Sequence, residues 1–559
     1  MFFLLAPRRI LISAALVASL ATGIPACMSQ ETPATYPVRG VVLNSITHRP
    51  IARALVDGHS DAALTDNDGR FEINLDEGFT QILVRRIGYN PNSPMGPHSV
   101  KVGPNMPGLT FYLTPEGGVT VHVSLSGGDA ADDIRFIAYR KRILGGHGMW
   151  MQQGNFTTDS EGNFKMVNLE SPATYVLCSM AAPERPLPRG SDKITHGYPP
   201  TCYPGVTDPS AANPISVLPG QQTEAEITLT RQPFYPVSIL MPGRGQGQFG
   251  GVSIMEQGGH GMGFPMRMNA QQGVAEANLP NGRYYAESRS NNGKTQAYGR
   301  IDFQVSGGPL GGLSLVQHPL SPIQVEIHKD FTPNTNQNVS GFASLSIGND
   351  NNPGLNINLV SADGSAMNMG GQNLQHPAGS SDSNLFEMTN VLPGRYWVQT
   401  FTFQGYVSSI SSGGVDLARE PLVIGPGGAT APIEIDLSNN GGQISGTIDL
   451  SSQPGSTPGS GDGQTSLIFA YAIPLFPSSS QMSMTFTQDS GRLMFSNLAP
   501  GTYRVIALDQ PEEIDLDDPA AMARWSTHGQ TVTVEPGATA SVQLDVFKTE
   551  ESAQEGSAP

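Results

Sequence analysis

The sequence carries little charge, and most of that charge is negative. Asp, Glu, Lys and Arg make up 14% of the 559 residues, and 48 acidic residues outnumber 31 basic ones, which gives a formal net charge of −17. Proteins that bind nucleic acid through its phosphates need a basic face. The sequence therefore predicts no nucleic-acid partner.

Long apolar runs are also scarce. The run from Ile10 to Leu20 follows Arg8 and Arg9, which is the order of charge and hydrophobicity in an export signal. This run is too short for the roughly 20 residues that span a bilayer, and no later run reaches that length. We therefore expect a signal peptide over residues 1–26, export to the periplasm, outer membrane or cell surface, and no integral membrane domain.

The signal ends in Ile24-Pro25-Ala26-Cys27. This ending resembles a lipoprotein processing box, in which an aliphatic residue and two small residues precede a lipidated Cys, but Pro25 departs from that pattern. Two outcomes stay open. Lipidation of Cys27 would anchor the chain to a membrane, whereas ordinary cleavage nearby would remove Cys27 or leave it unmodified.

Cysteine is rare, with three in the chain. If Cys27 is lipidated or removed, Cys178 and Cys202 remain as a pair that an exported chain can oxidise. A disulfide between them would tie a strand to a loop of the same repeat. The alternative is two independent free thiols.

Glycine and proline are plentiful, at 65 and 45 residues, and they mark an internal repeat. The repeated motif has an Asn followed by an aliphatic residue, then Gly four positions and usually Tyr six positions after the Asn. Its copies recur at spacings of 94 to 112 residues, which predicts one domain per copy. The copies are NLDEGFT (74–80), NLESPATY (168–175), NLPNGRY (278–284), NVLPGRY (390–396) and NLAPGTY (497–503). We expect the Gly to supply a positive φ and the Tyr to bury its ring beneath the turn, with its hydroxyl on a backbone group.

Alternating apolar residues, the period of a half-buried strand, follow each motif, as in YRVIALD (503–509). Later in each repeat a Pro/Gly turn separates two further strands, as in residues 214–229, so we expect the repeats to end in hairpins. Only DDPAAMARW (517–525) has a helical pattern. The sequence predicts an all-β chain, a tandem array of about five antiparallel β-sandwich domains of the Ig-like or transthyretin-like kind.

Short joints that contain Pro, near residues 114–117, 231–236 and 317–322, separate these domains and favour an extended, semi-rigid rod. The sequence also predicts a flexible loop over 451–464 and a disordered acidic tail. The expected β-sandwich repeats span residues 36–115, 116–232, 233–320, 321–440 and 441–549, with the tail at 550–559.

The first repeat (36–89) resembles the carboxypeptidase regulatory-like domain, a transthyretin-like sandwich. The residues that carry the resemblance are Val38, Gly40, Val42, Pro50, Ala54, Val56, the turn at 65–71, Gly88 and Tyr89. The last repeat has a looser version, with Gly446, Ile448, Gly491 and the segment 500–503. The resemblance implies a fold without activity, because no His in this chain has the Glu three residues later that zinc carboxypeptidases use, and no HExxH helix is present.

Motifs of other chemistry are missing as well, since no nucleophile elbow and no phosphate-binding loop is present. We predict no cofactor and no catalytic residue, although an enzyme with an unrecognised constellation stays open. Asp66-Asn67-Asp68-Gly69 offers oxygen ligands for calcium, but a tight turn explains it better. The segments HGMWMQQ (147–153) and MEQGGHGMGFPMRM (255–268) either bind soft metals or form Met-packed loops and strands.

Two function classes follow. The favoured one is a non-catalytic scaffold of the bacterial cell envelope that binds envelope proteins; the alternative is a protein that binds polysaccharide through exposed aromatic rings. The chain has three Trp. Trp150 and Trp525 are the candidates for stacking on sugars, and Trp397 is expected in a core. Exposure of both candidates would favour carbohydrate binding, and burial of both would count against it.

Overall fold

The computed structural model describes residues 34–90, 98–104, 106–184, 194–207, 211–242, 251–258, 263–269, 272–291, 296–332, 354–363, 370–372, 374–402, 405–449, 468–478, 482–487 and 491–547. In this part of the chain the structure is almost entirely β, and the strands form five successive sandwiches. Each sandwich has a hydrophobic core of its own. The predicted signal peptide with Cys27, the loop 451–464 and the acidic tail lie outside the described residues.

Sandwich 1 shows why these residues form strands. In the segment 70–76 the side chains of Phe71, Ile73 and Leu75 are buried, whereas those between them face water, so the alternation of the sequence becomes the two faces of a sheet. Its strands are β1 (Thr35–Asn44), β2 (Leu55–Asp57), β3 (Ala62–Leu64), β4 (Arg70–Asp76), β5 (Gly78–Arg85), β6 (His98–Val102) and β7 (Leu109–Leu113), in sheets ordered β4-β1-β7 and β3-β2-β5-β6.

Sandwich 2 contains the longest hairpin of the described residues. Its strands are β8 (Gly118–Leu125), β9 (Arg135–Leu144), β10 (His147–Thr157), β11 (Asn163–Met166), β12 (Ala173–Ser179), β15 (Ile215–Val217) and β16 (Gln222–Leu229), in sheets ordered β10-β9-β12-β15 and β11-β8-β16. We call β9 and β10 the central hairpin.

Sandwich 3 takes two short strands from the segment that follows β12, so its sheet begins before the joint near 231–236. Those strands, β13 (Ala182–Pro183) and β14 (Thr195–Tyr198), pair onward to β17 (Gln232–Leu240). The others are β18 (Val252–Glu256), β19 (Met266–Asn269), β20 (Val274–Leu279), β21 (Gly282–Asn291), β22 (Gln296–Val305), β23 (Leu310–Ser314) and β24 (His318–Pro319), and the second sheet runs β18-β21-β22-β24.

Sandwich 4 pairs a six-stranded sheet with a four-stranded one, in the orders β28-β29-β25-β34-β31-β32 and β27-β26-β30-β33. Its elements are β25 (Ile323–Asp330), β26 (Leu355–Ser361), β27 (Gly370–Gln372), β28 (Leu374–Gln375), β29 (Leu385–Met388), β30 (Gly394–Thr402), β31 (Tyr406–Ser412), β32 (Val415–Asp416), β33 (Leu422–Ile424), the 3-10 turn η4 (Pro426–Gly428) and β34 (Ile433–Ser438).

Sandwich 5 is one seven-stranded sheet that curls on itself and carries the α-helix of the described residues. Its elements are β35 (Gly442–Asp449), β36 (Ile468–Pro474), β37 (Ser483–Thr487), β38 (Arg492–Leu498), β39 (Gly501–Leu508), α1 (Pro519–Ser526), β40 (Gln530–Val534) and β41 (Thr539–Phe547). The sequence predicted α1 correctly, and Asp518 caps it by accepting a hydrogen bond from Ala520 N.

The prediction that repeats end in hairpins is wrong. In sandwich 2 the strand before the Pro-Gly turn, β15, pairs with β12, whereas the strand after it, β16, pairs in parallel with β8 in the other sheet. Sandwich 4 repeats this arrangement with β33 and β34. The turn therefore connects two strands that belong to different sheets and does not join two paired strands. In every sandwich a late strand pairs in parallel with an early one, which places the late strand beside the early strand in the same direction.

The predicted role of the motif tyrosine is confirmed in four sandwiches. Tyr175, Tyr284, Tyr396 and Tyr503 are at most 4% exposed. Each hydroxyl donates to the carbonyl oxygen four or five residues earlier, at 2.7 to 3.0 Å. Burial raises the pKa of the Tyr175 phenol to about 12. Sandwich 1 has Phe79 and Thr80 at the end of its motif, and Phe79 is 81% exposed.

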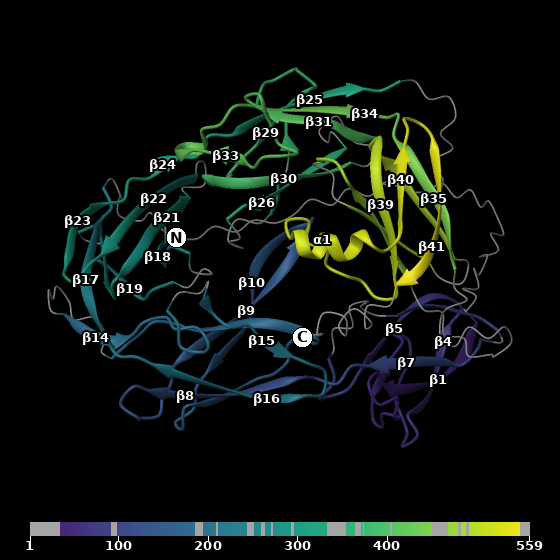
Figure 1. The fold of residues 1–559 in the computed structure, drawn as a ribbon, viewed down its shortest axis with the longest axis horizontal. Coiled ribbons are helices and arrows are strands. Elements are labelled where there is room, and N and C mark those ends of the chain that lie inside the picture. Colours follow the sequence, from purple (N-terminus) through teal and green to yellow (C-terminus); the bar gives the residue numbers. More distant parts are fainter. Residues whose placement is uncertain are drawn as a thin grey trace, which may run out of the picture.

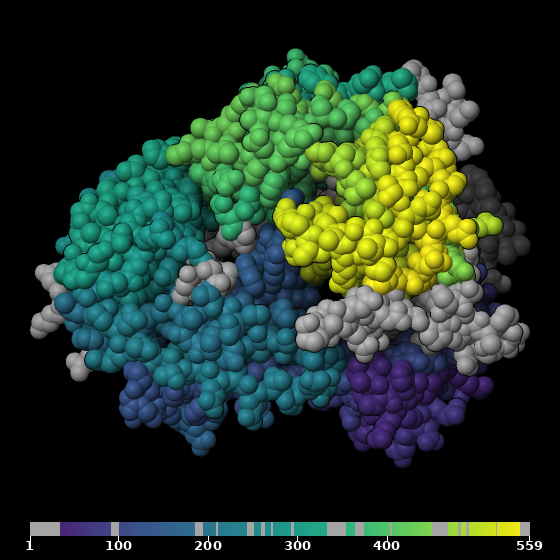
Figure 2. All heavy atoms as spheres, viewed as in Figure 1, coloured from purple at the N-terminus to yellow at the C-terminus, as the bar shows by residue number. Residues whose placement is uncertain are grey.

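The five sandwiches follow one another around a ring and not along a rod (Figure 1). Sandwich 5 returns to the region of sandwiches 1 and 2, and the central hairpin rises from sandwich 2 into the middle of the ring, where it ends beside α1. The space-filling view shows sandwiches 4 and 5 in close contact above the central hairpin (Figure 2). The expectation of an extended rod is therefore wrong, and the reason lies in the contacts of this hairpin.

Candidate functional site: the hub at the central hairpin

A two-residue turn of Gly145 and Gly146 forms the tip of the central hairpin. Leu144 pairs with His147, so the two glycines are the whole loop, and both have positive φ values of 57° and 89°. This is the geometry of a tight hairpin that follows the twist of its strands. The absence of side chains also lets other sandwiches approach, because a Cβ on Gly146 would lie 2.4 Å from Leu516 Cδ1.

Basic residues on β9 meet an acidic loop of sandwich 5, residues 512–518. Lys141 Nζ lies 2.8 Å from Asp515 Oδ2, and Arg142 Nε lies 2.7 Å from Glu513 Oε1. Asp515 is only 7% exposed, so removal of Lys141 would leave a buried carboxylate without this partner. The backbone adds two hydrogen bonds, from Ile143 N to Glu513 Oε2 and from Leu516 N to the carbonyl of Gly146.

The same hairpin tip contacts sandwich 4. The His147 ring stacks on the Trp397 indole with centroids 4.5 Å apart and planes within 3°, and His147 Nδ1 lies 2.8 Å from Asp517 Oδ2. Gln399 Nε2 donates to the carbonyl oxygens of Leu144 and Gly145 at 3.1 and 3.2 Å. His147 therefore joins three sandwiches.

Glu170 holds the base of the hairpin in sandwich 2, because it pairs with both Arg140 and Arg142. On the facing side, Glu512 is half-buried, and desolvation raises the pKa of its carboxyl. We call the whole set, from Glu170 to the loop 512–518, the hub. The basic side chains of the hub form ion pairs with carboxylates from other segments. These ion pairs fix the positions of the hairpin and of the segments it contacts, and they leave few charged groups for proton transfer or metal binding. In the described part of the chain, no three His, Cys, Asp or Glu side chains gather as a metal site would require.

The tryptophans differ from the sequence prediction in two of three cases. Trp525 is 3% exposed and is covered by Phe547 and by the Arg524 guanidinium, so it cannot stack on a sugar, and its assignment as a stacking residue is wrong. Trp397 does not belong to the core of sandwich 4, since it lies on the outer face of β30 against His147. Trp150 is half-buried and packs beside the cluster that contains Cys178 and Cys202.

Cys178 and Cys202 form a disulfide with an S–S distance of 2.04 Å. Cys178 lies on β12, and Cys202 lies in the loop that follows β14, so the bond ties a strand to a loop. Both sulfurs are buried in a small cluster with Ile137, Tyr139 and Val176. The disulfide therefore stabilises the sheet face from which the central hairpin extends.

The Met-rich segments are packed as strands in the described residues. Met149 is fully buried, Met255 is 4% exposed, and Met266 and Met268 pack against the core of sandwich 3. This confirms the Met-packed alternative, because those thioethers face apolar neighbours. Residues 259–262, which include His260, lie outside the described residues.

The Asp66 turn is a tight turn, as the sequence favoured. Asp66 Oδ1 accepts hydrogen bonds from the backbone N–H groups of Asp68 and Arg70 at 2.9 and 2.7 Å, and Gly69 has a φ of 71°. Because one carboxylate oxygen is engaged by its own turn, the segment is better suited to fixing the backbone than to holding calcium.

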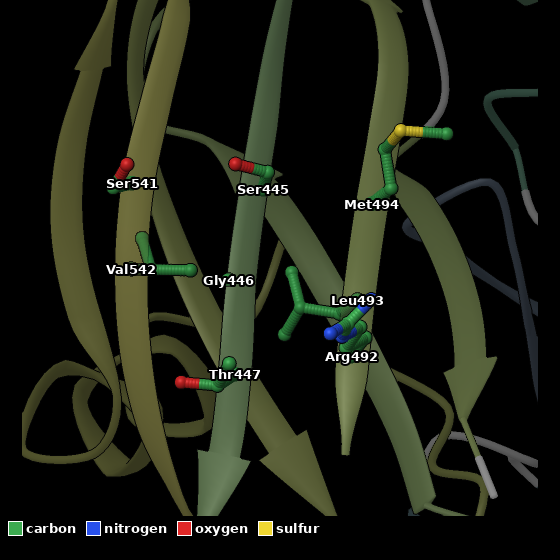
Figure 3. A pocket seen from close by; sticks show the side chains of 8 residues that line it. All are labelled: Ser445, Gly446, Thr447, Arg492, Leu493, Met494, Ser541 and Val542. Carbon is green, nitrogen blue, oxygen red and sulfur yellow. The ribbon is translucent and has the colours of Figure 1, made fainter. Parts of the chain in front are cut away.

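A shallow groove of about 550 Å³ lies on the outer surface of sandwich 5 (Figure 3). It forms around Gly446 on β35, toward which Val542 and Leu493 point from the neighbouring strands. A Cβ at Gly446 would lie 2.3 Å from the Val542 carbonyl oxygen, so close strand packing explains this glycine. The groove contains Ser and Thr hydroxyls but no arrangement of acid, base and nucleophile.

Sequence reasoning missed the acidic residues of the hub and Gln399. One signal was available: Arg140, Lys141 and Arg142 form a basic triplet in a chain with few cations, and residues 512–518 (EEIDLDD) form an acidic run. The pairing of the two segments could not be read from either one alone.

The described residues include no helix long and apolar enough to cross a membrane. No family model matches the chain, and no curated protein matches it. Solved structures with some likeness are bacterial proteins. The TIE protein of Bacillus anthracis is 13% identical over 73% of this chain and 68% of its own, with a TM-score of 0.15.

Two pilins give similar values. A minor pilin of Streptococcus agalactiae is 14% identical over 35% of this chain and 97% of its own, with a TM-score of 0.19. A streptococcal ancillary pilin is 12% identical over 56% of this chain and 98% of its own, with a TM-score of 0.15. Nothing about function follows from likenesses at these TM-scores.

Proposed function

We propose that this chain is a non-catalytic, exported scaffold of the bacterial cell envelope, which holds five sandwiches in a closed ring and presents their outer faces to protein partners. The observation that carries the proposal is the hub, where one hairpin bonds to two sandwiches that follow much later in the sequence. Contacts of this kind fix the mutual positions of the sandwiches, and a fixed display surface requires fixed positions.

Two further features support export. The sequence begins with the charge and hydrophobicity pattern of a signal peptide. The disulfide between Cys178 and Cys202 is a bond that persists in oxidising compartments. Attachment to a membrane through a lipid on Cys27 is part of the proposal, and the match to carboxypeptidase regulatory-like domains stays a resemblance.

The experiment is zero-length cross-linking in intact cells. A carbodiimide joins an amine to a carboxylate in contact, so Lys141 and Asp515, 2.8 Å apart, should become covalently linked. We expect this cross-link, found by mass spectrometry, on protein recovered in the envelope fraction. Lys101 forms no ion pair among the described residues, so it should give no such cross-link and serves as the internal control. Recovery of the chain in the cytoplasm, or absence of the cross-link from envelope-bound protein, would contradict the proposal.

A Cys27→Ala variant tests the anchor separately. If Cys27 is lipidated, the variant should move from the membrane pellet to the soluble part of the envelope, while the Lys141–Asp515 cross-link persists. An unchanged distribution would remove lipidation from the proposal.

A further inference from the structure

A cavity of about 450 Å³ lies where sandwich 1 meets sandwich 2. Three arginines line it: Arg53, Arg85 and Arg86. Leu55 on β2 pairs with Arg85 on β5, so both side chains lie on the same face of the sheet, which turns toward the cavity. The volume falls within the roughly 300 to 1,000 Å³ of small-molecule sites.

These three arginines have no ion pair with a carboxylate among the described residues, and they lie together around one cavity. Elsewhere Arg39, Arg231, Arg300 and Arg419 form ion pairs with Glu72, Glu184, Asp302 and Asp416. Three guanidinium groups outnumber the single carboxylate of Glu116 in the lining, so the cavity has a positive potential in a chain whose net charge is −17. The cavity therefore favours an anionic ligand.

The cavity is held in shape by the joint between the sandwiches. Glu116 N donates to the carbonyl of Gly88 at 3.0 Å, and Asn90 N donates to that of Thr114 at 2.8 Å, which fixes the joint to sandwich 1. Gly220 N donates to the Pro115 carbonyl at 3.2 Å, which fixes it to sandwich 2. A binding site with a fixed backbone loses little entropy when a ligand binds.

Arg53 at the cavity has a left-handed backbone with a φ of 58°, whereas the φ of 59° at Asn168 belongs to the motif turn and recurs at Asn390 and Asn497. This conformation is uncommon for Arg, and hydrogen bonding holds it, since Arg53 N donates to the Thr65 carbonyl at 2.9 Å. A side chain held at a cavity by an unfavourable backbone conformation is a typical feature of binding sites.

The remaining lining identifies the class of anion. Arg groups only donate hydrogen bonds, Glu116 accepts them, and the Asn168 amide does both. Sugar hydroxyls also donate and accept, so they can satisfy all three kinds of group. Leu55 and Tyr89 add apolar surface against which the C–H face of a sugar ring can pack. A carboxylate alone only accepts hydrogen bonds and cannot pair with Glu116, so a ligand that suits this lining carries hydrogen-bond donors beside its carboxylate.

We propose that this cavity, the arginine pocket, binds a carboxylate-bearing sugar residue of an acidic polysaccharide. Arg85 and Arg86 hold the carboxylate by charge-assisted hydrogen bonds, Glu116 accepts from a hydroxyl, and the ring lies on Leu55 and Tyr89. The proposal is independent of the hub, because neither Lys141 nor the loop 512–518 contributes to the pocket.

The test is isothermal titration calorimetry of the chain from Gln30 onward with tetragalacturonate. The controls are maltotetraose, a neutral sugar of the same length, and tetraglutamate, an acidic peptide. We expect tetragalacturonate alone to bind, and more weakly as salt is added. No heat with tetragalacturonate overturns the proposal. Equal binding of tetraglutamate overturns the assignment to sugar in favour of an acidic peptide.

Variants assign the binding to the pocket. Arg85→Gln combined with Arg86→Gln should weaken tetragalacturonate binding about tenfold or more, because charge-assisted hydrogen bonds are lost. Arg70→Gln, an exposed arginine of the same sandwich outside the pocket, should leave it unchanged. Unchanged binding by the double variant, with circular dichroism showing a native fold, overturns the proposal.

Glu116→Gln separates sugar binding from plain anion binding. A sugar hydroxyl loses a charged acceptor, so tetragalacturonate should bind several-fold more weakly. If the pocket only attracted negative charge, removal of Glu116 would strengthen binding, and that result would contradict the sugar assignment.

Discussion

The Asn, Gly and Tyr of the repeated motif each have a distinct role in the turn. Asn168, Asn390 and Asn497 take the left-handed conformation, with φ between 57° and 63°. Asn tolerates this region better than most residues. The motif glycine has the predicted positive φ at Gly78, Gly394 and Gly501, with values of 127°, 159° and 155°. Gly282 does not share it, and close packing explains that glycine, because a Cβ there would lie 2.8 Å from the hydroxyl oxygen of Tyr284. The sequence thus predicts the turn and the role of most of its glycines, but not the left-handed Asn.

Removal of one motif hydroxyl should destabilise its sandwich. In Tyr396→Phe the half-buried Leu392 carbonyl loses its donor at 3.0 Å, and we expect a loss of about 1 kcal/mol in the free energy of unfolding. Urea unfolding followed by tryptophan fluorescence measures it, since Trp397 is the next residue. Tyr112→Phe is the control, because that side chain is 38% exposed. Equal effects of the two changes would contradict the role of the buried hydroxyl.

Glu512 gives the stability of sandwich 5 a dependence on pH. Desolvation raises the pKa of its carboxyl, so the folded chain binds this proton more tightly than the unfolded chain does. By linkage, the contribution of Glu512 to stability is unfavourable at neutral pH and improves as pH falls through the raised pKa.

Glu512→Gln should therefore raise the free energy of unfolding at pH 7, and the gain should shrink as the pH falls to about 4, where the native carboxyl is protonated. Urea unfolding at a series of pH values checks this. Glu535→Gln, an exposed carboxylate of the same sandwich, should show no such trend. A gain that grows as pH falls would show that the pKa is shifted in the opposite direction.

At the scale of elements, the strands could be predicted but their partners could not. The alternation around β15 and β16, or β33 and β34, marks two strands and a turn correctly. A hairpin and a crossing between sheets have the same local pattern, however, and only the distant strands β8 and β25 decide between them. Pairing across about 100 residues leaves no local signature.

The tip of the central hairpin allows a matched test. Gly146 and Gly128 have nearly equal φ values of 89° and 88°, so Ala at either position meets the same backbone strain. A Cβ at Gly146 would contact Leu516, whereas nothing lies within 4 Å of one at Gly128. We expect Gly146→Ala to displace the hairpin and lower the sedimentation coefficient. Gly128→Ala should leave it unchanged, and equal behaviour of both variants would contradict the docking.

At the scale of the whole molecule, the sequence predicts five sandwiches but not their arrangement. Short joints with proline suggested a rod, yet the joint at 114–117 is a bonded corner and not a straight spacer. The contacts that close the ring join residues 374 positions apart, as in the pair of Lys141 with Asp515. The charges in the sequence allow many ion pairs between distant residues, and only the geometry of the folded sandwiches determines which pair forms.

A charge exchange tests this closure. Lys141→Asp places like charges at the hub, and Asp515→Lys does the same from the other side, so each should increase hydrogen exchange at the amides of β10. The double variant restores opposite charges and should recover most of the protection. Additive losses in the double variant would show that the two side chains do not interact.

Small-angle X-ray scattering of the chain from Gln30 onward tests the ring most directly. A closed arrangement predicts a radius of gyration of about 25–30 Å, slightly above that of a compact chain of this length. Five sandwiches in a row would give about 50 Å. A radius of gyration near that of the closed arrangement supports the hub as the set of contacts that fixes the scaffold. A radius of gyration near that of the extended row would contradict this role.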